Sequence, residues 1–176
     1  QTGTGKTAAF GLPLLQRTDT YSNKIQTLIL CPTRELCLQI GKDLSTYSKY
    51  LKNINILSVY GGAKIDKQIR SLKKGPQIIV GTPGRTKDLI KRKKLFLKNI
   101  KQLVLDESDE MLSMGFKDDL EFIIKSASKE KQILLFSATM NSKVNAVTKK
   151  YMKNSLDISV ASVNRAAENV DHLFYV

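Results

Sequence analysis

Features that would place the chain in a membrane or outside the cell are missing from its sequence. No apolar run approaches the ~20 residues that a helix needs to cross a bilayer. The N-terminal segment contains no charged region followed by an apolar core, so nothing indicates a secretory signal. The only cysteines are Cys31 and Cys37, which we interpret as reduced thiols in a reducing compartment. These absences predict a cytoplasmic protein without a membrane-spanning helix.

Acidic residues and histidine are also scarce. The chain has 16 acidic residues against 29 lysines and arginines, which gives a formal net charge of +13. Such a charge favours a polyanionic partner, either nucleic acid or an anionic membrane surface. A lysine-rich solvated surface would explain the charge equally well. The single histidine, His172, has no partner cluster, and we predict a surface or linker position for it. Composition therefore leaves the partner open.

Internal repeats and low-complexity segments are absent as well, and the chain instead alternates between two kinds of segment. Apolar segments that predict strands are Gln26–Cys31, Asn55–Tyr60, Gln77–Gly81, Gln102–Leu105, Gln132–Phe136 and Leu156–Val160. Segments that predict helices are Gly5–Gln16, Glu35–Leu51, Ile65–Lys73, Arg85–Lys93, Asp118–Ser126 and Lys143–Met152. The near-continuous hydrophobicity of the strands is typical of a parallel sheet buried on both faces. The alternation predicts one α/β domain, with a mostly parallel sheet and helices on both faces.

The chain begins with a glycine-rich segment that leads into the first predicted helix. This segment consists of Gln1, Thr2, Gly3, Thr4, Gly5, Lys6 and Thr7. Glycines let backbone N–H groups turn toward phosphate oxygens, and the helix N-terminus favours negative charge. Lys6 would reach the β- and γ-phosphates of a nucleotide, and the hydroxyl of Thr7 would bind Mg²⁺. The segment therefore predicts a phosphate-binding loop (P-loop) rather than a glycine-rich helix cap.

Two adjacent carboxylates, Asp106 and Glu107, follow the apolar strand segment Gln102–Leu105. Open α/β sheets bind ligands at the carboxyl ends of their strands. There Asp106 can hold the Mg²⁺ shell, and Glu107 can polarise the attacking water in phosphoryl transfer. Read alone, the pair would more often be a polar turn, but a P-loop in the same chain favours the catalytic interpretation.

These motifs resemble those of a known family. Asp106-Glu107-Ser108-Asp109 is similar to the Asp-Glu-Ala-Asp signature of the DEAD-box RNA helicases, with serine where alanine is usual. Further signatures in the family's order are Pro32-Thr33-Arg34-Glu35-Leu36, Gly61-Gly62, Thr82-Pro83-Gly84-Arg85 and Ser137-Ala138-Thr139. The resemblance extends from Gln1 to about Val160, and the motif sequences are most similar to bacterial members. It implies a RecA-like P-loop domain, the N-terminal domain of an ATP-dependent RNA helicase.

The resemblance also implies roles for the residues that match the motifs. The P-loop residues Thr2, Gly3, Thr4, Gly5, Lys6 and Thr7 would bind ATP, and Thr7 and Asp106 would hold Mg²⁺. Lys6, Asp106 and Glu107 would be catalytic. Asp109 would hydrogen-bond with Ser137 and Thr139, which would couple the nucleotide state to closure onto a second domain.

A second set of matching residues would bind RNA. It consists of Pro32, Thr33, Arg34, Gly61, Gly62, Thr82, Gly84 and Arg85. Glycines allow close approach of the backbone to phosphates, and arginine forks suit phosphate oxygens. Contacts to the sugar–phosphate backbone would give sequence-independent binding of single-stranded or short duplex RNA, with no membrane partner. Taken singly, the glycine motifs would be ordinary turns and helix starts.

The ends of the chain suggest how the domain is organised. We expect residues 1–160 to form the RecA-like domain, truncated at the P-loop, and residues 161–176 to form a linker and the start of an absent second RecA-like domain. That second domain would carry the arginine finger, so the isolated chain should be nearly inactive. Two other functions stay open: a DNA helicase of the same superfamily, and a non-catalytic RNA-binding or scaffold domain.

Overall fold

The computed structural model describes residues 5–159, which are built around a five-stranded parallel sheet. The strands are β1 (Thr27–Leu30), β2 (Ile56–Val59), β3 (Ile78–Gly81), β4 (Gln102–Leu105) and β5 (Gln132–Leu135). Their order in the sheet is β2-β3-β1-β4-β5, and every neighbouring pair is parallel. The predicted α/β fold with a parallel sheet is confirmed.

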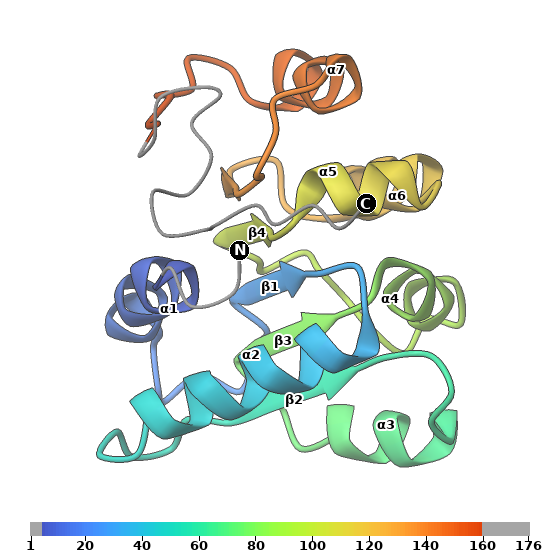
Figure 1. Cartoon of the computed structure of the whole chain (residues 1–176). Helices are drawn as coiled ribbons and strands as arrows, with labels where there is room; N and C mark the ends of the chain where they lie inside the picture. The colour runs from blue at the N-terminus through green and yellow to red at the C-terminus, as the bar shows by residue number, and fades with distance from the viewer. Residues whose placement is uncertain (1–4, 160–176) are drawn as a thin grey trace, which may run out of the picture.

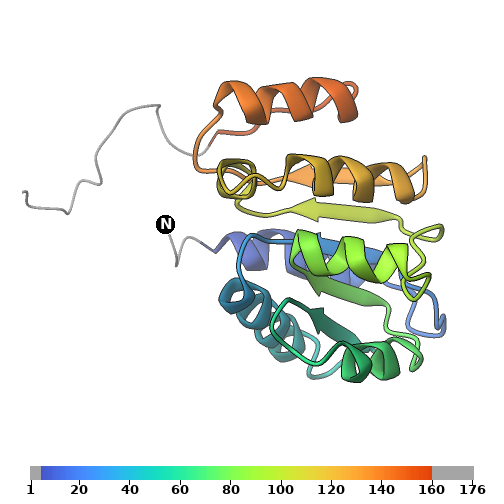
Figure 2. The same ribbon diagram turned by 90° about the vertical axis from the view of Figure 1, so that its right-hand side faces the viewer.

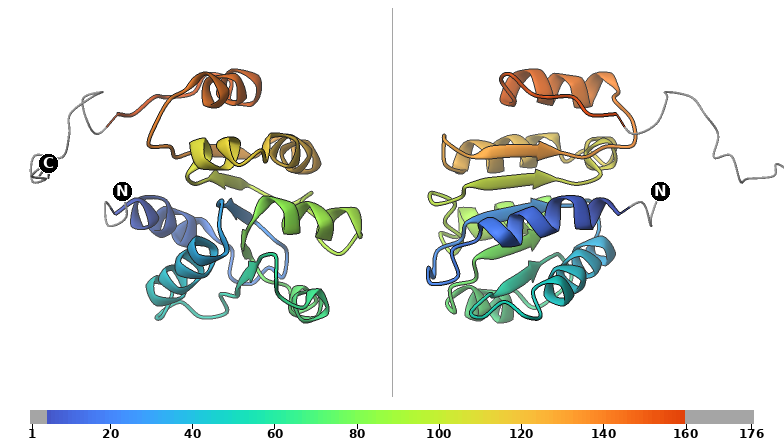
Figure 3. Two further views of the ribbon diagram at one scale, coloured as in Figure 1. Left: turned by 45° about the vertical axis from the view of Figure 1, so that its right-hand side comes forward. Right: turned by 90° about the vertical axis from the view of Figure 1, so that its left-hand side faces the viewer.

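Seven helices lie around this sheet in the described part of the chain (Figure 1). They are α1 (Lys6–Arg17), α2 (Arg34–Tyr47), α3 (Ile65–Leu72), α4 (Pro83–Lys91), α5 (Ser108–Ser113), α6 (Lys117–Ser126) and α7 (Ser142–Tyr151). Helices α1 and α2 cover one face of the sheet, and α3, α4 and α6 cover the other (Figure 3). Helix α7 lies at the β5 end of the molecule. Helices on both faces were predicted, and no helix within residues 5–159 is long and apolar enough to span a membrane.

Successive strand residues enter two separate hydrophobic cores. In β1, Leu28 and Leu30 belong to the core on the side of α4 and α6, whereas Ile29 belongs to the core on the side of α1 and α2. Strand β4 follows the same pattern, with Val104 on the α1–α2 side. Because side chains alternate between the faces of a strand, a sheet covered on both faces requires apolar residues at every position. This explains the continuous hydrophobic runs of the sequence.

The structure differs from the sequence prediction in three segments. The described part of Leu156–Val160, residues 156–159, is not a strand, and Leu156 and Ile158 are 83% and 76% exposed. A strand requires a neighbour, and no other described strand pairs with this segment. Helix α2 ends at Tyr47 rather than Leu51, whose side chain is exposed. Helix α5 was not predicted, because its six residues are too few to show a helical period.

Candidate nucleotide and nucleic-acid site

The motif residues within residues 5–159 gather at one edge of the sheet. All strands end at this edge because they are parallel, and α1 begins on the side toward which the strand arrows point (Figure 2). The segments expected to bind RNA follow β1, β2 and β3, while the catalytic and coupling residues follow β4 and β5 or begin α1. We call the segments after β1, β2 and β3 the RNA half of this edge, and those after β4 and β5 with the start of α1 the nucleotide half, after the ligands that the sequence predicts for them. The predicted P-loop residues Thr2, Gly3 and Thr4 lie outside the described residues.

The N-terminus of α1 has the features of an anion site. Gly5, the N-cap residue, is left-handed with φ 74°, a conformation that glycine adopts without the strain of a Cβ atom. No side chain caps the helix, and its first turn contains no acidic residue. Ala9 donates a backbone hydrogen bond to the Gly5 carbonyl at 2.9 Å. The N–H groups of the first helical turn have no partner within the helix itself, and in this position they are suited to phosphate oxygens.

Asp106 follows β4 and is almost completely buried, with 3% of its surface exposed. Burial raises the pKa of its carboxyl, the charge of Lys6 acts in the opposite direction, and the charge of Glu107 raises the pKa further. The carboxyl and the first residue of α1 are thus within electrostatic reach of each other, although they are a hundred positions apart in sequence. A buried carboxylate of this kind is stabilised by a bound cation.

Glu107 occupies a strained position in the turn from β4 into α5. Its backbone is left-handed, with φ 50° and ψ 50°, which is uncommon for a residue other than glycine. The next residue, Ser108, donates from both its backbone N and its Oγ to the Phe136 carbonyl, each at 3.0 Å. This buried pair of hydrogen bonds ties the turn to the end of β5. Strain held in place by surrounding contacts is typical of functional sites.

Asp109 connects α5 to the segment after β5. Thr139 donates to its Oδ2 from the backbone N at 3.0 Å and from Oγ1 at 2.8 Å. Burial would raise the pKa of Asp109, but the hydrogen bonds to the carboxylate outweigh burial and hold the pKa below its usual value. Ser137 donates from Oγ to the Thr139 carbonyl at 2.7 Å, which braces the same segment. The structure thus brings Asp109 and Thr139 into direct contact.

In the RNA half, Thr33 and Arg34 stand at the start of α2. The Thr33 hydroxyl accepts a hydrogen bond from the Leu36 N–H at 3.2 Å and so caps the helix. The exposed Arg34 guanidinium lies over the Tyr60 ring, 5.0 Å from its centroid. Gly62 is left-handed with φ 82°, which explains why the turn after β2 needs glycine there. Pro32 is buried after β1, so its contribution to a ligand site is limited to its backbone and ring edge.

The segment after β3 contributes Thr82, Gly84 and Arg85. Thr82 is the N-cap of α4, and Gly84 is exposed in its first turn. Arg85 is half-buried and points back into the protein: both its Nη atoms donate to the Ala63 carbonyl, at 3.1 and 3.2 Å. Its Nη1 also donates to Oε1 of Gln68 at 2.9 Å. These contacts were not anticipated from the sequence.

Sequence reasoning missed Tyr60 and Gln68 as members of this half of the site. The signal for Gln68 was present, because Ile65, Gln68 and Leu72 share one face of α3 by their spacing. A glutamine on an otherwise apolar stripe indicates a buried polar contact. Tyr60 carried no comparable signal.

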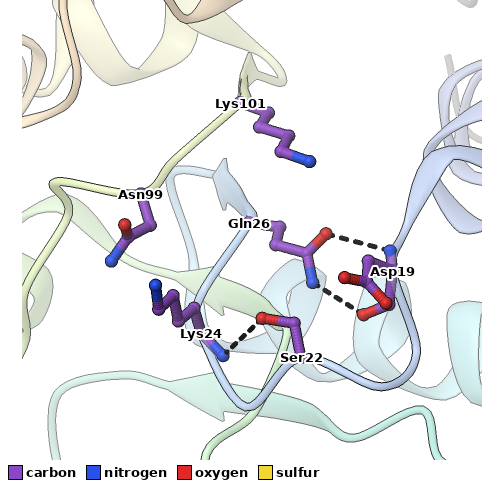
Figure 4. Close-up of a pocket in the computed structure, with 6 residues that line it drawn as sticks. All are labelled: Asp19, Ser22, Lys24, Gln26, Asn99 and Lys101. Atoms are coloured by element: carbon purple, nitrogen blue, oxygen red, sulfur yellow. Dashed lines mark hydrogen bonds between the residues drawn. The ribbon is translucent and has the colours of Figure 1, made fainter.

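A shallow hollow lies at the opposite edge of the sheet, where the strands begin (Figure 4). It is lined by Asp19, Ser22, Lys24, Gln26, Asn99 and Lys101. The Gln26 side chain forms two hydrogen bonds with the Asp19 backbone. Its Oε1 accepts from the Asp19 N at 2.9 Å, and its Nε2 donates to the Asp19 carbonyl at 2.8 Å. The hollow is therefore separate from the motif residues and lies between the α1–β1 connection and the segment that precedes β4.

Comparison with known proteins connects these features to a family. The profile of the family described as DEAD/DEAH box helicase matches residues 1–147. The chain is 49% identical over 174 residues to the ATP-dependent RNA helicase CshA of Listeria monocytogenes, covering 99% of this chain and 33% of that protein. It is 48% identical over 174 residues to the DEAD-box ATP-dependent RNA helicase CshA of Streptococcus pneumoniae, with the same coverage. The chain thus spans about a third of the length of these relatives.

Solved structures agree with the sequence comparison. A DEAD box protein from the hyperthermophile Methanococcus jannaschii superposes with a TM-score of 0.83 at 47% identity, covering 88% of this chain and 42% of the other. The yeast DEAD-box splicing factor Prp28 superposes with a TM-score of 0.80 at 33% identity, covering 87% of this chain and 39% of the other.

Proposed function

The chain belongs to the DEAD/DEAH box helicase family, and from this premise we propose that it is the ATP-binding domain of a longer, ATP-dependent RNA helicase. In this proposal residues 1–160 form the RecA-like domain, and residues 161–176 form a linker and the start of a second one. The observation that carries the proposal is that the motif residues gather at one edge of a parallel sheet, where the strands end and α1 begins. Two buried, free cysteines suit the reducing cytoplasm in which we place the protein.

In the nucleotide half, the backbone N–H groups at the start of α1 and the side chain of Lys6 would bind the phosphates of ATP. Thr7 and Asp106 would hold Mg²⁺, which neutralises charge on the phosphates when it is bound. Residues 5–159 contain no cluster of three or more His, Cys, Asp or Glu side chains that could hold a metal ion. The two donors Thr7 and Asp106 nevertheless fit Mg²⁺, because this ion is usually held by one or two protein ligands together with substrate phosphates and water.

Glu107 and Asp109 would then have separate tasks in hydrolysis. The half-exposed Glu107 carboxylate would orient the attacking water and accept its proton at a carboxylate oxygen. Asp109 would hold Thr139, so that the segment after β5 is positioned when a second RecA-like domain closes onto the site. Both tasks depend on the turn that Ser108 fastens to the end of β5.

In the RNA half, the residues after β1, β2 and β3 would contact the sugar–phosphate backbone of one strand. The exposed Arg34 offers charge, and the Gly61-Gly62 turn and the start of α4 offer backbone N–H groups. A net charge of +13 adds long-range attraction for a polyanion. Contacts of this type do not read bases, so we expect binding that is independent of sequence.

ATPase assays on the full-length protein test the proposal. We expect hydrolysis to be stimulated by two RNA oligomers of unrelated sequence and much less by DNA of the same sequences. Equal stimulation by DNA would support a DNA helicase instead. RNA binding without hydrolysis under any condition would support a non-catalytic RNA-binding or scaffold domain.

A further inference from the structure

We propose that Gln68, together with Arg85, is a positioning residue of the RNA half: the pair fixes the turn from Tyr60 to Ala63, and Arg85 acts through this turn rather than as a phosphate ligand. This inference rests on the proposed RNA-binding function and deepens it. It assigns a role to a residue outside every helicase motif seen in the sequence. It also changes the role expected for Arg85.

Both ends of the Gln68 side-chain amide are hydrogen-bonded inside the protein. The residue is 6% exposed on α3. Its Nε2 donates to the Tyr60 carbonyl at 3.1 Å, and its Oε1 accepts from Nη1 of Arg85 at 2.9 Å. A carbonyl at one end and a guanidinium at the other allow only one orientation of the amide. A buried polar side chain with both ends satisfied specifies the local arrangement and is costly to replace.

Arg85 completes the arrangement from the other side. Its two Nη atoms converge on the Ala63 carbonyl, and with the Gln68 contact three hydrogen bonds engage its fork. A guanidinium has five N–H donors, so most of them are already directed at protein acceptors. A phosphate bound by Arg85 would have to compete with these contacts or use the few donors that remain.

The two side chains hold the turn at both ends. Gln68 holds the Tyr60 carbonyl and Arg85 holds the Ala63 carbonyl, so the Gly61-Gly62 pair lies between two anchors. The Tyr60 ring in turn lies beneath the Arg34 guanidinium of α2. A Cβ atom built on Gly62 would lie 3.7 Å from Nη1 of Arg34, which places these two motifs side by side. Gln68 therefore joins the segments after β2 and β3, and the turn that it holds contacts Arg34 of the segment after β1.

A positioning role and a phosphate-binding role predict different salt dependence. Removing a phosphate ligand lowers affinity and reduces the slope of log affinity against log salt by roughly one unit. Removing a positioning residue lowers affinity by disordering the turn but leaves the number of neutralised phosphates unchanged. The slope then stays as it was.

The test uses the full-length protein, a fluorescently labelled single-stranded RNA and anisotropy titrations across a salt series. Gln68→Leu keeps the approximate volume and removes both hydrogen bonds. Arg85→Lys keeps the charge and removes the fork, whereas Arg85→Ala removes both the charge and the fork. We expect each to weaken RNA binding by about tenfold, with an unchanged salt slope. Gln16→Leu, the same substitution at an exposed position at the far end of α1, should bind as the wild type does.

Hydrogen exchange of the segment 60–63 provides a readout without RNA. We expect exchange there to accelerate in Gln68→Leu and Arg85→Lys but not in Gln16→Leu. If Gln68→Leu does not fold, as judged by circular dichroism, Gln68→Glu takes its place, because it keeps the acceptor for Arg85 and loses the donor to Tyr60. Arg85→Lys then still tests the contact between Arg85 and the Ala63 carbonyl.

The outcomes separate this inference from the proposed function. A wild-type protein that does not bind RNA would contradict the proposed function itself. If the wild type binds RNA, wild-type affinity in Gln68→Leu would overturn the inference. So would a salt slope reduced by about one unit in Arg85→Ala, or unchanged hydrogen exchange at residues 60–63 in Gln68→Leu and Arg85→Lys.

Discussion

Asp106 and Glu107 are adjacent in the chain, but their surroundings differ. Asp106 is buried within electrostatic reach of Lys6, where its charge is suited to a cation. Glu107 is half-exposed in a left-handed turn, where water has access. We therefore assign metal binding to the first carboxylate and the reacting water to the second.

This assignment predicts distinct effects in the full-length protein. Glu107→Gln should bind ATP and Mg²⁺ as the wild type does, while hydrolysis falls on the order of 10²–10⁴-fold, because the general base is lost. Lys6→Ala should weaken nucleotide binding itself. Binding is measured with a fluorescent nucleotide and turnover by phosphate release. Glu110→Gln, at an exposed position of α5, is the matched control and should keep wild-type activity. Equal loss of nucleotide binding in Glu107→Gln and Lys6→Ala would contradict the assignment.

Thr86 presents a different situation within α4. Its Oγ1 is the one buried side-chain polar atom without a hydrogen-bond partner among residues 5–159. Leaving a buried hydroxyl unpaired costs about 1–3 kcal/mol, and valine has nearly the same shape without that group.

Thr86→Val should therefore raise the free energy of unfolding, by about 1 kcal/mol. The control is Thr148→Val on α7, where Oγ1 donates to the Val144 carbonyl at 3.1 Å. This second change removes a formed hydrogen bond and should lower stability by about 0.5–1 kcal/mol. Urea denaturation of both variants measures the difference. If Thr86→Val proves as destabilising as Thr148→Val, the Thr86 hydroxyl has a hydrogen-bond partner in solution.

At the scale of elements, α5 is linked to the segment after β5 by the hydrogen bonds from Thr139 to Asp109. The pKa of Asp109 is lowered in the folded protein, so folding favours its charged form. Stability from this link is present above the unfolded-state pKa of about 3.9 and is lost as the pH falls through the lower folded-state pKa.

Thr139→Val removes one of the two hydrogen bonds and makes this dependence measurable. At pH 7 the variant should be less stable by at most about 1 kcal/mol, because the site is exposed to solvent. The difference from the wild type should shrink as the pH falls below about 4. Unfolding free energies of both proteins between pH 7 and pH 3 check this. A difference that stays constant down to pH 3 would show that the Asp109 charge does not contribute.

Elements and site residues were predictable to different degrees. Runs such as Leu103–Leu105 identify buried strands because both faces of the sheet are covered, and this requirement is visible in the sequence. The segment beginning at Leu156 alternates apolar and polar residues, which also predicts a strand, but whether it pairs depends on a neighbouring strand. The motifs located the site at the strand ends. The contacts of Gln68 and Arg85 were not predictable, because they depend on how α3 and α4 pack beside the turn after β2.

At the scale of the whole molecule, we propose that the two halves of one sheet edge bind two different ligands. Closure by a second domain would complete both halves. Because the proposed arginine finger lies in that domain, the chain of residues 1–176 should hydrolyse ATP at least on the order of 10³-fold more slowly than the full-length protein. Steady-state ATPase with saturating RNA tests this expectation. Strong RNA-stimulated turnover by the isolated chain would contradict it.

The strand order also has a consequence for synthesis on the ribosome. Strand β1 is made early, yet its neighbours in the sheet are β3 and β4, which begin at Ile78 and Gln102. A ribosome adds roughly 5–20 residues per second, so β1 emerges seconds before either partner exists. During this interval both edges of a largely apolar strand are unpaired in the nascent chain. The same topology that brings the site together thus creates a period in which the unfinished protein is exposed to aggregation through its unpaired strand edges.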